Sequence, residues 1–399
     1  MHGQMSRSVA ADVPPICRTA PAVAPRLGVL ATHAIQYQAP LYQEISRRNI
    51  VDLDVAYLSA KGAVPHYDAD FGITVTWDVD LLSGYRWTLL ECGTLRNGIN
   101  WLSDLIAWIR QHDIVVLHGY TDPAMLFAAA VCQILQVPYL MRGDSQAESA
   151  ATGLRLFARH VLASFAVRGA AGALTIGQLN ADFYARYGRI PRFWAPYSID
   201  NDRFRAAADV ARCDRSQRLA SLGLDPQRPV VIFSGKLIPI KRPLDAVQAI
   251  EKCKGELSLL VIGDGPLRSE IRKFEARLPV RCLGFVNQTE LPRWYACGDV
   301  LVLPSIRDKW GLVVNEGMAC GLVPVVSDAV GSAPDLVEGV GKVVPVGDIH
   351  ELARALLWAA NCDRDQVNLI RRKLEHFTIT ETARGYEQAA LALRRKPRR

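Results

Sequence analysis

Short apolar segments that alternate with helical patterns constrain the fold of this chain more than any other feature of the sequence. In the first half these segments are residues 27–31, 52–58, 114–117 and 137–141. The alternation begins again in the second half with residues 230–234, 258–262, 280–283, 300–303 and 323–327. Continuous apolar segments are typical of central parallel strands, because helices cover both faces of such a sheet.

Prolines support helices between the strands of the second half. Pro243 precedes Leu244 and Val247 at helical spacing, and a proline is tolerated in the first turn of a helix. Pro266 is expected to open the next helix in the same way. Two successive units of about 170 residues predict an α/β protein with two Rossmann-like, doubly wound domains that face each other across a cleft. We expect the hinge near residues 196–204.

Length and composition agree with this prediction. A chain of 399 residues is long enough for two or three domains, and 50% apolar residues supply ample core-forming material. The 47 basic and 40 acidic residues give a net charge of +7, a mild excess that favours anionic ligands or an acidic membrane surface. This excess is too small to indicate nucleic acid, so we expect no nucleic-acid partner.

Cysteine spacing and the lack of long apolar runs favour a cytoplasmic protein. The nine cysteines are scattered, with no C-x-x-C pair and no histidines at zinc spacing, which favours reduced thiols in the core. The longest apolar run, residues 124–132, is about half as long as a membrane-spanning helix needs to be. Residues 1–25 contain no continuous apolar stretch, and we interpret them as a flexible N-terminal arm.

The loop after the first strand of the second half carries two lysines. Lys236 and Lys241 lie between the end of the predicted strand and the start of the next helix. Lysines in that position can neutralise a bound diphosphate, and the helix N-terminus adds unpaired N–H groups and partial positive charge. The alternative is a pair of solvated surface lysines, and the loop alone does not decide between the two.

A second loop, residues 302–312, leads directly into an apolar segment that ends at Gly321. From Asp308 to Glu316 an ideal helix would turn by ~800°, so the two carboxylates would not share a helical face. If Asp308 precedes the helix and Glu316 lies within it, both can accept from sugar hydroxyls, and Gly311 lets backbone N–H groups approach a phosphate. The alternative is an aspartate helix cap with a buried glutamate.

Five ordered motifs indicate a family. The lysine loop is followed by VIGDGP at residues 261–266, LGFV at 283–286, LPS at 303–305 and an acidic-x7-Glu helix. In this order and at this spacing, residues 234–328 resemble the donor half of GT-B glycosyltransferases of family 4. The resemblance covers the second half of the chain strongly and the first half loosely. It implies the GT-B fold, with an acceptor-side domain at residues 26–200, a donor-binding domain at 201–380, and a C-terminal helix and basic tail at 381–399.

The resemblance also implies roles for residues of the donor half. Lys236 and Lys241 would hold the donor diphosphate, Glu316 would bind the ribose, and Asp308 would contact sugar hydroxyls; these four are our catalytic candidates on this side. The implied donor-binding set is Gly235, Lys236, Lys241, Phe285, Val286, Asp308, Gly311, Leu312, Val313 and Glu316. Within it, Phe285 and Val286 would border the base, and Gly311 and Leu312 would offer backbone N–H groups.

Two of these positions depart from the family pattern. The family usually has arginine where Lys236 stands, and lysine lacks the planar fork that grips a phosphate through two hydrogen bonds. It usually has glutamate where Asp308 stands, so the side chain here is one methylene shorter. We expect the donor sugar to sit differently, with weak or altered activity as one consequence.

The acceptor side is predicted from three loops of the first half. Residues 32–42 lack the family's usual glycines and resemble a bacterial surface-polysaccharide branch with the pattern His-x-Ile-Gln-Tyr-x-x-Pro-Leu. His33, Gln36 and Tyr37 are the acceptor contacts that this loop predicts, and the alternative is that they only satisfy the loop itself. His118 follows a strand beside a glycine, a place better suited to a ligand than to packing, and it joins the catalytic candidates. Arg142 ends the next strand and is expected to line the cleft.

Three Asp-x-Asp pairs between residues 52 and 80 raise the question of a metal. They are residues 52 and 54, 68 and 70, and 78 and 80. Such a pair can hold a divalent ion that bridges a diphosphate. In this chain the lysine loop already supplies positive charge, so we predict no metal site and no required cofactor.

Two basic or amphipathic segments favour a membrane contact. Residues 154–167 mix Phe157, Val161 and Phe165 with arginines, and residues 394–399 form a strongly basic tail. Both suit an anionic leaflet that carries a lipid-linked acceptor, at the inner face of the cell membrane. A packed helix and a solvated tail are the alternative.

Together these features predict a metal-independent, hexosyltransferase-type enzyme of surface-polysaccharide or glycoconjugate synthesis. It would move a sugar from a nucleotide-diphosphate donor to a hydroxyl of a glycan or lipid-linked acceptor, and the resemblance alone implies retention at the anomeric carbon. The nucleotide sugar is a co-substrate. Two alternatives stay open: a non-catalytic nucleotide-sugar-binding or scaffold protein on the same fold, and a sugar-nucleotide epimerase. A dinucleotide dehydrogenase is disfavoured, since no G-x-G-x-x-G opens either half.

Overall fold

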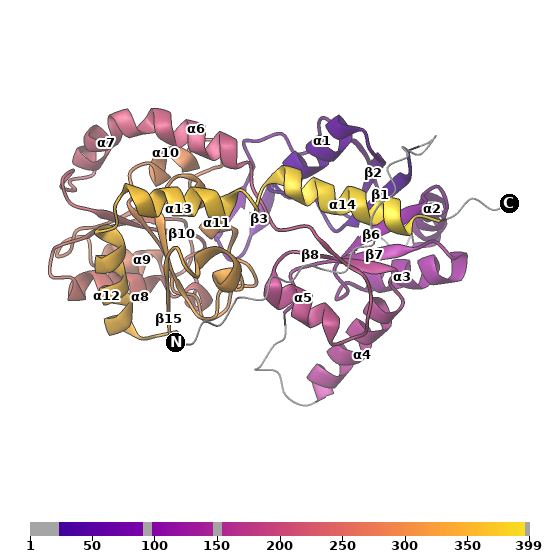
Figure 1. The fold of residues 1–399 in the computed structure, drawn as a ribbon. Coiled ribbons are helices and arrows are strands. Elements are labelled where there is room, and N and C mark those ends of the chain that lie inside the picture. The colour runs from indigo at the N-terminus through magenta and orange to yellow at the C-terminus, as the bar shows by residue number, and fades with distance from the viewer. Residues whose placement is uncertain (1–23, 91–97, 147–153, 396–399) are drawn as a thin grey trace.

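The computed structural model describes residues 24–90, 98–146 and 154–395, which form two α/β domains side by side (Figure 1). The predicted N-terminal arm, apart from its last two residues, lies outside the described residues. The end of the basic tail, residues 396–399, also lies outside them, as do Cys17 and Cys92. The prediction of two doubly wound, Rossmann-like domains is confirmed by two sheets that are each entirely parallel.

The first sheet has seven strands in the order β5-β2-β1-β6-β7-β8-β9. Their bounds are β1 Arg26–Ala31, β2 Asp52–Tyr57, β5 Arg86–Leu89, β6 Ile114–His118, β7 Tyr139–Arg142, β8 Gly172–Thr175 and β9 Arg192–Trp194. Helices cover both faces of this sheet. Val29 packs with residues of α1 (Ala39–Arg48) and α14 (Ile379–Leu393), and Leu30 packs with residues of α2 (Gly98–Arg110) and α3 (Pro123–Leu135) on the opposite face. The sequence predicted β1, β2, β6 and β7 but not β5, β8 or β9.

The second sheet has six strands in the order β12-β11-β10-β13-β14-β15. Their bounds are β10 Val230–Ser234, β11 Ser258–Ile262, β12 Val280–Gly284, β13 Val300–Leu303, β14 Val323–Ser327 and β15 Lys342–Val344. The first five were predicted, and every residue of β10, β11, β13 and β14 is buried. Only the short edge strand β15 was missed.

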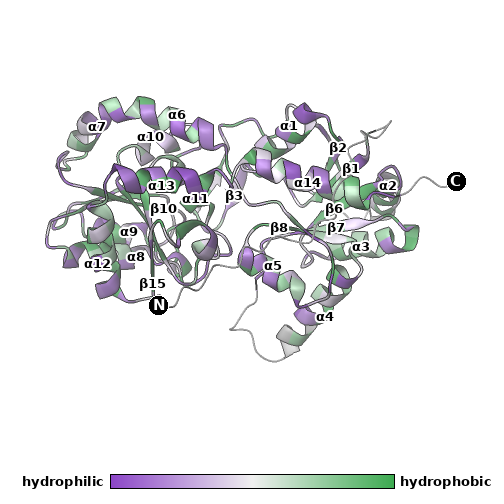
Figure 2. Cartoon of the chain, in the orientation of Figure 1, coloured by the Kyte–Doolittle hydropathy of each residue, from purple (hydrophilic) through white to green (hydrophobic). Residues whose placement is uncertain are grey.

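Helices fill the connections between the strands. In the first domain they are α1 Ala39–Arg48, α2 Gly98–Arg110, α3 Pro123–Leu135, α4 Leu154–Arg168 and α5 Gln178–Ala185. The second domain has α6 Asn201–Ala211, α7 Arg215–Ser221, α8 Pro243–Lys252, α9 Arg268–Arg272, α10 Leu291–Tyr295, α11 Leu312–Ala319, α12 Ile349–Ala360 and α13 Arg364–Leu374, and the last helix is α14 Ile379–Leu393. Figure 2 shows that α3 is mainly hydrophobic and α13 mainly hydrophilic. This difference agrees with their burial, because α3 has more buried residues than α13.

The two prolines behave differently. Pro243 is the first residue of α8, as predicted. Pro266 does not open α9, which begins two residues later at Arg268. Gly265, with φ of +146°, begins a turn that is closed by the N–H of Arg268 donating to the carbonyl oxygen of Gly265. The N–H of Leu267 donates to the carbonyl oxygen of Leu237 and ties this turn to the lysine loop.

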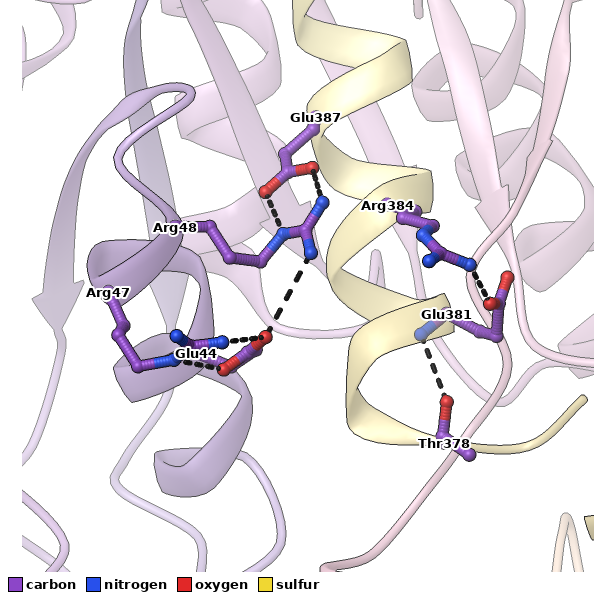
Figure 3. Close-up of polar contacts among 7 residues, drawn as sticks. All are labelled: Glu44, Arg47, Arg48, Thr378, Glu381, Arg384 and Glu387. Atoms are coloured by element: carbon purple, nitrogen blue, oxygen red, sulfur yellow. Dashed lines mark hydrogen bonds and ion pairs between the residues drawn. The ribbon is translucent and has the colours of Figure 1, made fainter. Parts of the chain in front are cut away.

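The last helix, α14, returns to the first domain. It packs on α1, β8 and β9, and Figure 1 shows it starting at the junction of the domains and running along the first one. Arg48 of α1 donates two hydrogen bonds, of 2.6 and 2.9 Å, to the buried carboxylate of Glu387 (Figure 3). The chain therefore crosses between the domains twice, before α6 and before α14, and the crossings meet in a β-bridge between Ile199 and Thr378.

An antiparallel hairpin extends from the first domain. It consists of β3 His66–Asp68 and β4 Ile73–Val75. Figure 1 shows β3 at the junction of the two domains. The sequence analysis assigned no structure to this segment.

Candidate active site

The lysine loop begins where β10 ends. Gly235 has φ of +147°, and its N–H donates to the carbonyl oxygen of Ile262 at the end of β11. The N–H of Leu237 donates to the carbonyl oxygen of Asp264. The loop that carries Lys236 and Lys241 is thus tied to the neighbouring strand-end loop at the carboxyl edge of the sheet, where open parallel sheets bind ligands.

The structure brings the two predicted donor loops together. The ammonium group of Lys241 lies 2.5 Å from a carboxylate oxygen of Asp308, and both side chains are largely buried. The N–H of Ile306 donates to the carbonyl oxygen of Ile240, which joins the backbones of the two loops. Asp308 precedes α11, as predicted, and its backbone forms a β-bridge with Val330.

Gly311 starts α11 from a left-handed conformation. Its φ is +80°, and a Cβ atom at this position would lie 2.8 Å from a methyl carbon of Leu303. Any other residue would therefore be strained here and would crowd β13. Leu312 and Val313 follow in the first turn of α11, where backbone N–H groups have no partner within the helix.

Glu316 lies one turn inside α11 and is held by a residue that the sequence analysis did not select. The hydroxyl of Tyr295 on α10 donates a hydrogen bond of 2.9 Å to its carboxylate. Burial raises the pKa of Glu316 to about 7, although Tyr295, the charge of Arg203 and the amide of Gln288 favour the ionised form. A carboxyl group poised near neutrality can accept from a ligand hydroxyl once it is ionised.

Lys236 has partners from the other domain. Its ammonium group donates to both carboxylate oxygens of Asp68, at 3.0 and 3.1 Å, and to one of Asp70, at 2.9 Å. Burial disfavours the charge on Lys236, but the two carboxylates outweigh this effect and raise its pKa. Burial likewise opposes ionisation of Asp68, but the ammonium of Lys236 and the backbone N–H groups of Phe71 and Asp70 together outweigh it and lower the pKa of Asp68.

Phe285, predicted to border the base together with Val286, also contacts the first domain. Its ring lies edge-on to Phe71, with 5.3 Å between centroids, and 6.2 Å from the ring of Trp77. Val286 packs at the margin of the second domain's core. Residues of both domains therefore surround the predicted base position.

His118 ends β6 and is bound on both ring nitrogens by protein groups. Its Nδ1 lies 3.2 Å from the side-chain nitrogen of Gln38, and its Nε2 lies 3.3 Å from the hydroxyl of Tyr386 and 3.5 Å from that of Tyr42. Burial, followed by the nearby charge of Arg142, lowers the pKa of His118 to about 3. The imidazole is therefore neutral at physiological pH and acts as a hydrogen-bonding group.

Arg142, expected to line the cleft, is only 2% exposed. Its guanidinium lies 5.1 Å from the ring centroids of both Tyr197 and Tyr386, and it donates to the carbonyl oxygen of Ala195. Arg142 therefore packs on Tyr386, which contacts His118, and on Tyr197.

The residues of the 32–42 loop lie at different depths. Tyr37 packs edge-on against Tyr197 at 5.7 Å, and Tyr197 packs against Trp310 of the donor loop at 6.1 Å, so an aromatic row joins the predicted acceptor and donor sides. Burial raises the pKa of Tyr37 to about 12. His33 is half-buried with its Nδ1 2.9 Å from the hydroxyl of Thr32, and Gln36 is partly exposed nearby.

Several residues around the candidate site were not predicted: Gln38, Tyr42, Asp68, Asp70, Arg203, Gln288, Tyr295 and Tyr386. Gln38 and Tyr42 lie within residues 32–42, and Asp68 and Asp70 form one of the Asp-x-Asp pairs, so these four belong to segments that stand out in the sequence. The other four come from distant parts of the chain and lie near the site only in the folded protein.

The three Asp-x-Asp pairs contact protein groups. Asp54 faces His112 and Trp108, and the Asp68–Asp70 pair holds Lys236. Asp78 accepts from the N–H of Thr289. Among the residues that the structure describes, no group of three or more histidine, cysteine, aspartate or glutamate side chains is arranged to hold a metal ion.

Solved structures with the same architecture identify the fold class. Anabaena HepE, solved in complex with UDP and glucose, superimposes with a TM-score of 0.69 at 15% identity, over 92% of this chain and 100% of that one. Sucrose-phosphate synthase from Thermosynechococcus elongatus gives a TM-score of 0.67 at 17% identity, over 92% and 99% of the two chains. The two parallel-sheet α/β domains, together with these neighbours, thus define the GT-B fold of glycosyltransferases.

Sequence comparison gives the family. Residues 228–361 match the family described as glycosyl transferases group 1. The 2-deoxystreptamine glucosyltransferase of Streptomyces kanamyceticus is 31% identical over 290 residues, which cover 67% of this chain and 70% of that protein. The chain belongs to the group 1 glycosyl transferases.

Other relatives match over shorter regions. The sulfoquinovosyl transferase SQD2 of Arabidopsis thaliana is 32% identical over 161 residues, which cover 39% of this chain and 30% of the relative. A D-inositol 3-phosphate glycosyltransferase of Xylanimonas cellulosilytica is 33% identical over 144 residues, or 34% of each protein. The chain thus spans about a third of the length of these curated relatives.

Proposed function

We propose that the protein is a retaining glycosyltransferase. It moves a hexose from a nucleotide-diphosphate donor to a hydroxyl of a glycan or lipid-linked acceptor, in the synthesis of a surface polysaccharide or glycoconjugate. The observation that carries the proposal is the ion pair between Lys241 and Asp308, formed beside the first turn of the helix that carries Glu316. This pair joins cationic, carboxylate and helix N-terminal groups at one edge of the donor domain.

The donor side of the reaction depends on charge. As the sugar leaves, negative charge grows on the diphosphate, and groups already in place stabilise that charge more in the transition state than in the bound donor. In our scheme Lys241 and the N–H groups of the first turn of α11 supply this stabilisation. Glu316 accepts hydrogen bonds from the ribose, and Asp308 accepts from hydroxyls of the transferred sugar. No metal ion has a role in the scheme.

The acceptor side depends on orientation. His118 is neutral, so we assign it hydrogen bonding to the transferred sugar rather than proton abstraction. His33, Gln36 and Tyr37 are assigned to the acceptor, and the aromatic row from Tyr37 to Trp310 supports a path between the two substrates. Arg142 would act through the rings of this row.

Calorimetric binding of UDP, GDP, ADP and dTDP tests the donor site, first without metal and then with magnesium. UDP comes first because HepE was solved with UDP and glucose. We expect one nucleotide to bind without metal and to lose its affinity in Glu316→Ala. If binding requires metal and is unchanged in Glu316→Ala, the donor-site assignment is wrong.

The pairing of Lys236 with Asp68 and Asp70 favours one alternative, a non-catalytic nucleotide-sugar-binding protein, because a predicted phosphate ligand is already engaged. Turnover separates the alternatives. Product sugar on an acceptor supports the transferase, and nucleotide binding without turnover over a broad panel of donors and acceptors supports the scaffold. A free epimerised sugar nucleotide in the absence of acceptor supports the epimerase.

A peripheral membrane contact through α4 is the last part of the proposal. Phe157 is 64% exposed on this helix, and Val161 and Phe165 are also exposed. No helix within the described ranges is both long and apolar enough to cross a bilayer. Vesicles that contain about 30% of the anionic lipid phosphatidylglycerol provide the test. On sedimentation they should capture more of the wild type than of Phe157→Ser/Phe165→Ser. Equal capture of both proteins would contradict a role for α4.

A further inference from the structure

The hairpin β3–β4 covers the predicted phosphate ligand of the other domain. Asp68 ends β3, Asp70 follows in the turn, and together they place three carboxylate oxygens within 3.1 Å of the ammonium of Lys236. The same ammonium lies 5.1 Å from the ring centroid of Phe71. Figure 1 shows β3 between the domains, where a single strand reaches both.

Further contacts fix the hairpin and its continuation on the same edge of the second sheet. Asn287 donates through its side-chain nitrogen to the carbonyl oxygen of Thr76, across 2.6 Å. The N–H of Thr289 donates to Asp78. The carbonyl oxygen of Asp70 approaches Gly265 so closely that a Cβ there would lie 3.0 Å from it. The contact is therefore an extended docked surface, and Lys236 is its charged centre.

While the hairpin is docked, the N–H donors of the Lys236 ammonium are all engaged by carboxylate oxygens and none is available to a phosphate. A lysine ammonium has three donors, and here three carboxylate oxygens accept from it. A phosphate oxygen can reach Lys236 only after a carboxylate has moved. Asp70 is the more mobile candidate for release, because 58% of its side chain is exposed against 20% for Asp68.

We propose that Asp68 and Asp70 are exchange partners of the donor diphosphate on Lys236. The diphosphate displaces the two carboxylates when the donor binds, and the carboxylates return to Lys236 when the nucleoside diphosphate leaves. This inference rests on the proposed function and deepens it by assigning two selectivity residues of the acceptor-side domain to the donor site. No covalent bond changes in the exchange.

The exchange has a selective effect on affinity. An intramolecular partner competes at an effective concentration on the order of millimolar, so every ligand that uses Lys236 binds less tightly than it would to a free ammonium. A nucleoside without phosphates does not use Lys236 and is unaffected. The carboxylates therefore favour release of the nucleoside diphosphate after transfer, a step that limits the rate of many enzymes.

Calorimetry on the full chain tests the exchange with three probes: UDP, uridine and inorganic pyrophosphate. We expect Asp68→Asn/Asp70→Asn to bind UDP and pyrophosphate about fivefold to tenfold more tightly than the wild type, and uridine equally. In a Lys236→Met background the same two substitutions should have no effect on UDP. Asp144→Asn is the matched control, because it removes another lysine–aspartate contact between the domains, to Lys309 at 3.0 Å, and should leave all affinities unchanged.

The outcomes separate this inference from the proposed function. If UDP binds wild type and Asp68→Asn/Asp70→Asn equally, the exchange is wrong and the donor site stands. If none of UDP, GDP, ADP and dTDP binds either protein but pyrophosphate binds the double variant more tightly, the donor-site proposal fails and the exchange stands. If neither these nucleotides nor pyrophosphate binds any variant, both are contradicted. If magnesium tightens UDP binding in the wild type alone, the two aspartates are metal ligands and the exchange is wrong.

Hydrogen exchange gives an independent readout. Release of the hairpin predicts faster amide exchange in residues 66–75 when UDP is added to the wild type. Slower exchange would mean that the hairpin closes over the ligand, which contradicts displacement. The same comparison in Lys236→Met should show no change on addition of UDP.

Discussion

The hydroxyl of Tyr295 donates a 2.9 Å hydrogen bond to the carboxylate of Glu316, and this is the contact that fixes the predicted ribose ligand on α11. Tyr295 lies on α10, which connects β12 to β13, so the orientation of Glu316 depends on a helix outside its own motif. Because the phenol donates, it stabilises the ionised carboxylate, while burial favours the protonated one. The balance of these effects leads to the first prediction.

Glu316→Gln should stabilise the protein at pH 8 and abolish nucleotide binding. The pKa of Glu316 is about 7, above its ordinary value of 4.5, so the folded state binds the proton more tightly than the unfolded state. Glu316 therefore lowers the free energy of unfolding progressively from about pH 4.5 to 7, and the loss persists above pH 7. Part of the residue is accessible to solvent, which weakens the effect. We therefore expect the free energy of unfolding of Glu316→Gln at pH 8 to exceed that of the wild type by on the order of 2 kcal/mol.

Thermal unfolding at pH 8 and pH 5 measures this difference. At pH 5 the wild-type carboxyl is largely protonated and resembles the amide, so the two Tm values should converge. A difference in Tm that is the same at both pH values would contradict the raised pKa.

Lys241→Ala should lower kcat/KM by about 100-fold, because a preorganised cation facing the departing diphosphate contributes roughly 3 kcal/mol. Removing it also leaves the largely buried Asp308 without its 2.5 Å partner. Lys252→Ala, on the exposed end of α8, is the control and should retain activity. Steady-state kinetics with the donor found by calorimetry checks the prediction, and unchanged kcat/KM in Lys241→Ala would remove the lysine from the mechanism.

His118 should stay neutral through the whole range in which the enzyme is active. Its pKa is lowered to about 3, so the imidazole signal in NMR should not titrate between pH 5 and 8, with assignment by comparison with His118→Asn. The unfolded state gains a proton below about pH 6.5 and the folded state does not, so this residue lowers stability as the pH falls from 6.5 toward 3. A midpoint near pH 6.5 in the folded protein would show that the ring is solvated and available for proton transfer.

Four strands of the second domain could be predicted because all of their residues are buried. The sequences of β10, β11, β13 and β14 are continuous apolar runs, and the predicted and observed bounds coincide. In contrast, all four residues of the edge strand β5 are exposed, so it has no apolar run to recognise. A run of apolar residues in the sequence indicates that a strand is buried. An exposed edge strand such as β5 has no such run, and its conformation depends on pairing with the neighbouring strand β2.

The same distinction applies to the site. Asp308 and Glu316 could be predicted from one motif, since a loop followed by a helix fixes their separation. The partners of Lys236 and His118 could not, because Asp68 is 168 residues from the lysine and Tyr386 is 268 residues from the histidine. The contacts of Lys236 depend on how the two domains meet, and the contact of His118 with Tyr386 depends on the return of α14 to the first domain. No local spacing encodes either. Whether the predicted residues bind substrate stays a prediction.

Glu387→Ala should destabilise the protein by about 2 kcal/mol, because it leaves the largely buried guanidinium of Arg48 with only its longer, 4.0 Å contact to Glu44. Only 4% of the Glu387 side chain is exposed, and Arg48 binds it through two nitrogens (Figure 3). Glu381→Ala on the same helix breaks a contact with the exposed Arg384 and should cost about 0.5 kcal/mol or less. Urea unfolding of both variants makes the comparison, and equal losses would show that α14 is not anchored through Glu387.

The paired crossings at Ile199 and Thr378 restrict how the domains can move. Domains joined by a single linker can rotate about several axes. Two adjacent linkers that are bridged to each other, as here, leave fewer axes of rotation. Relative motion is then confined mainly to one axis that runs through the bridge. Opening and closing would follow the same arc in each catalytic cycle, so the hairpin and the lysine loop would meet in the same register each time.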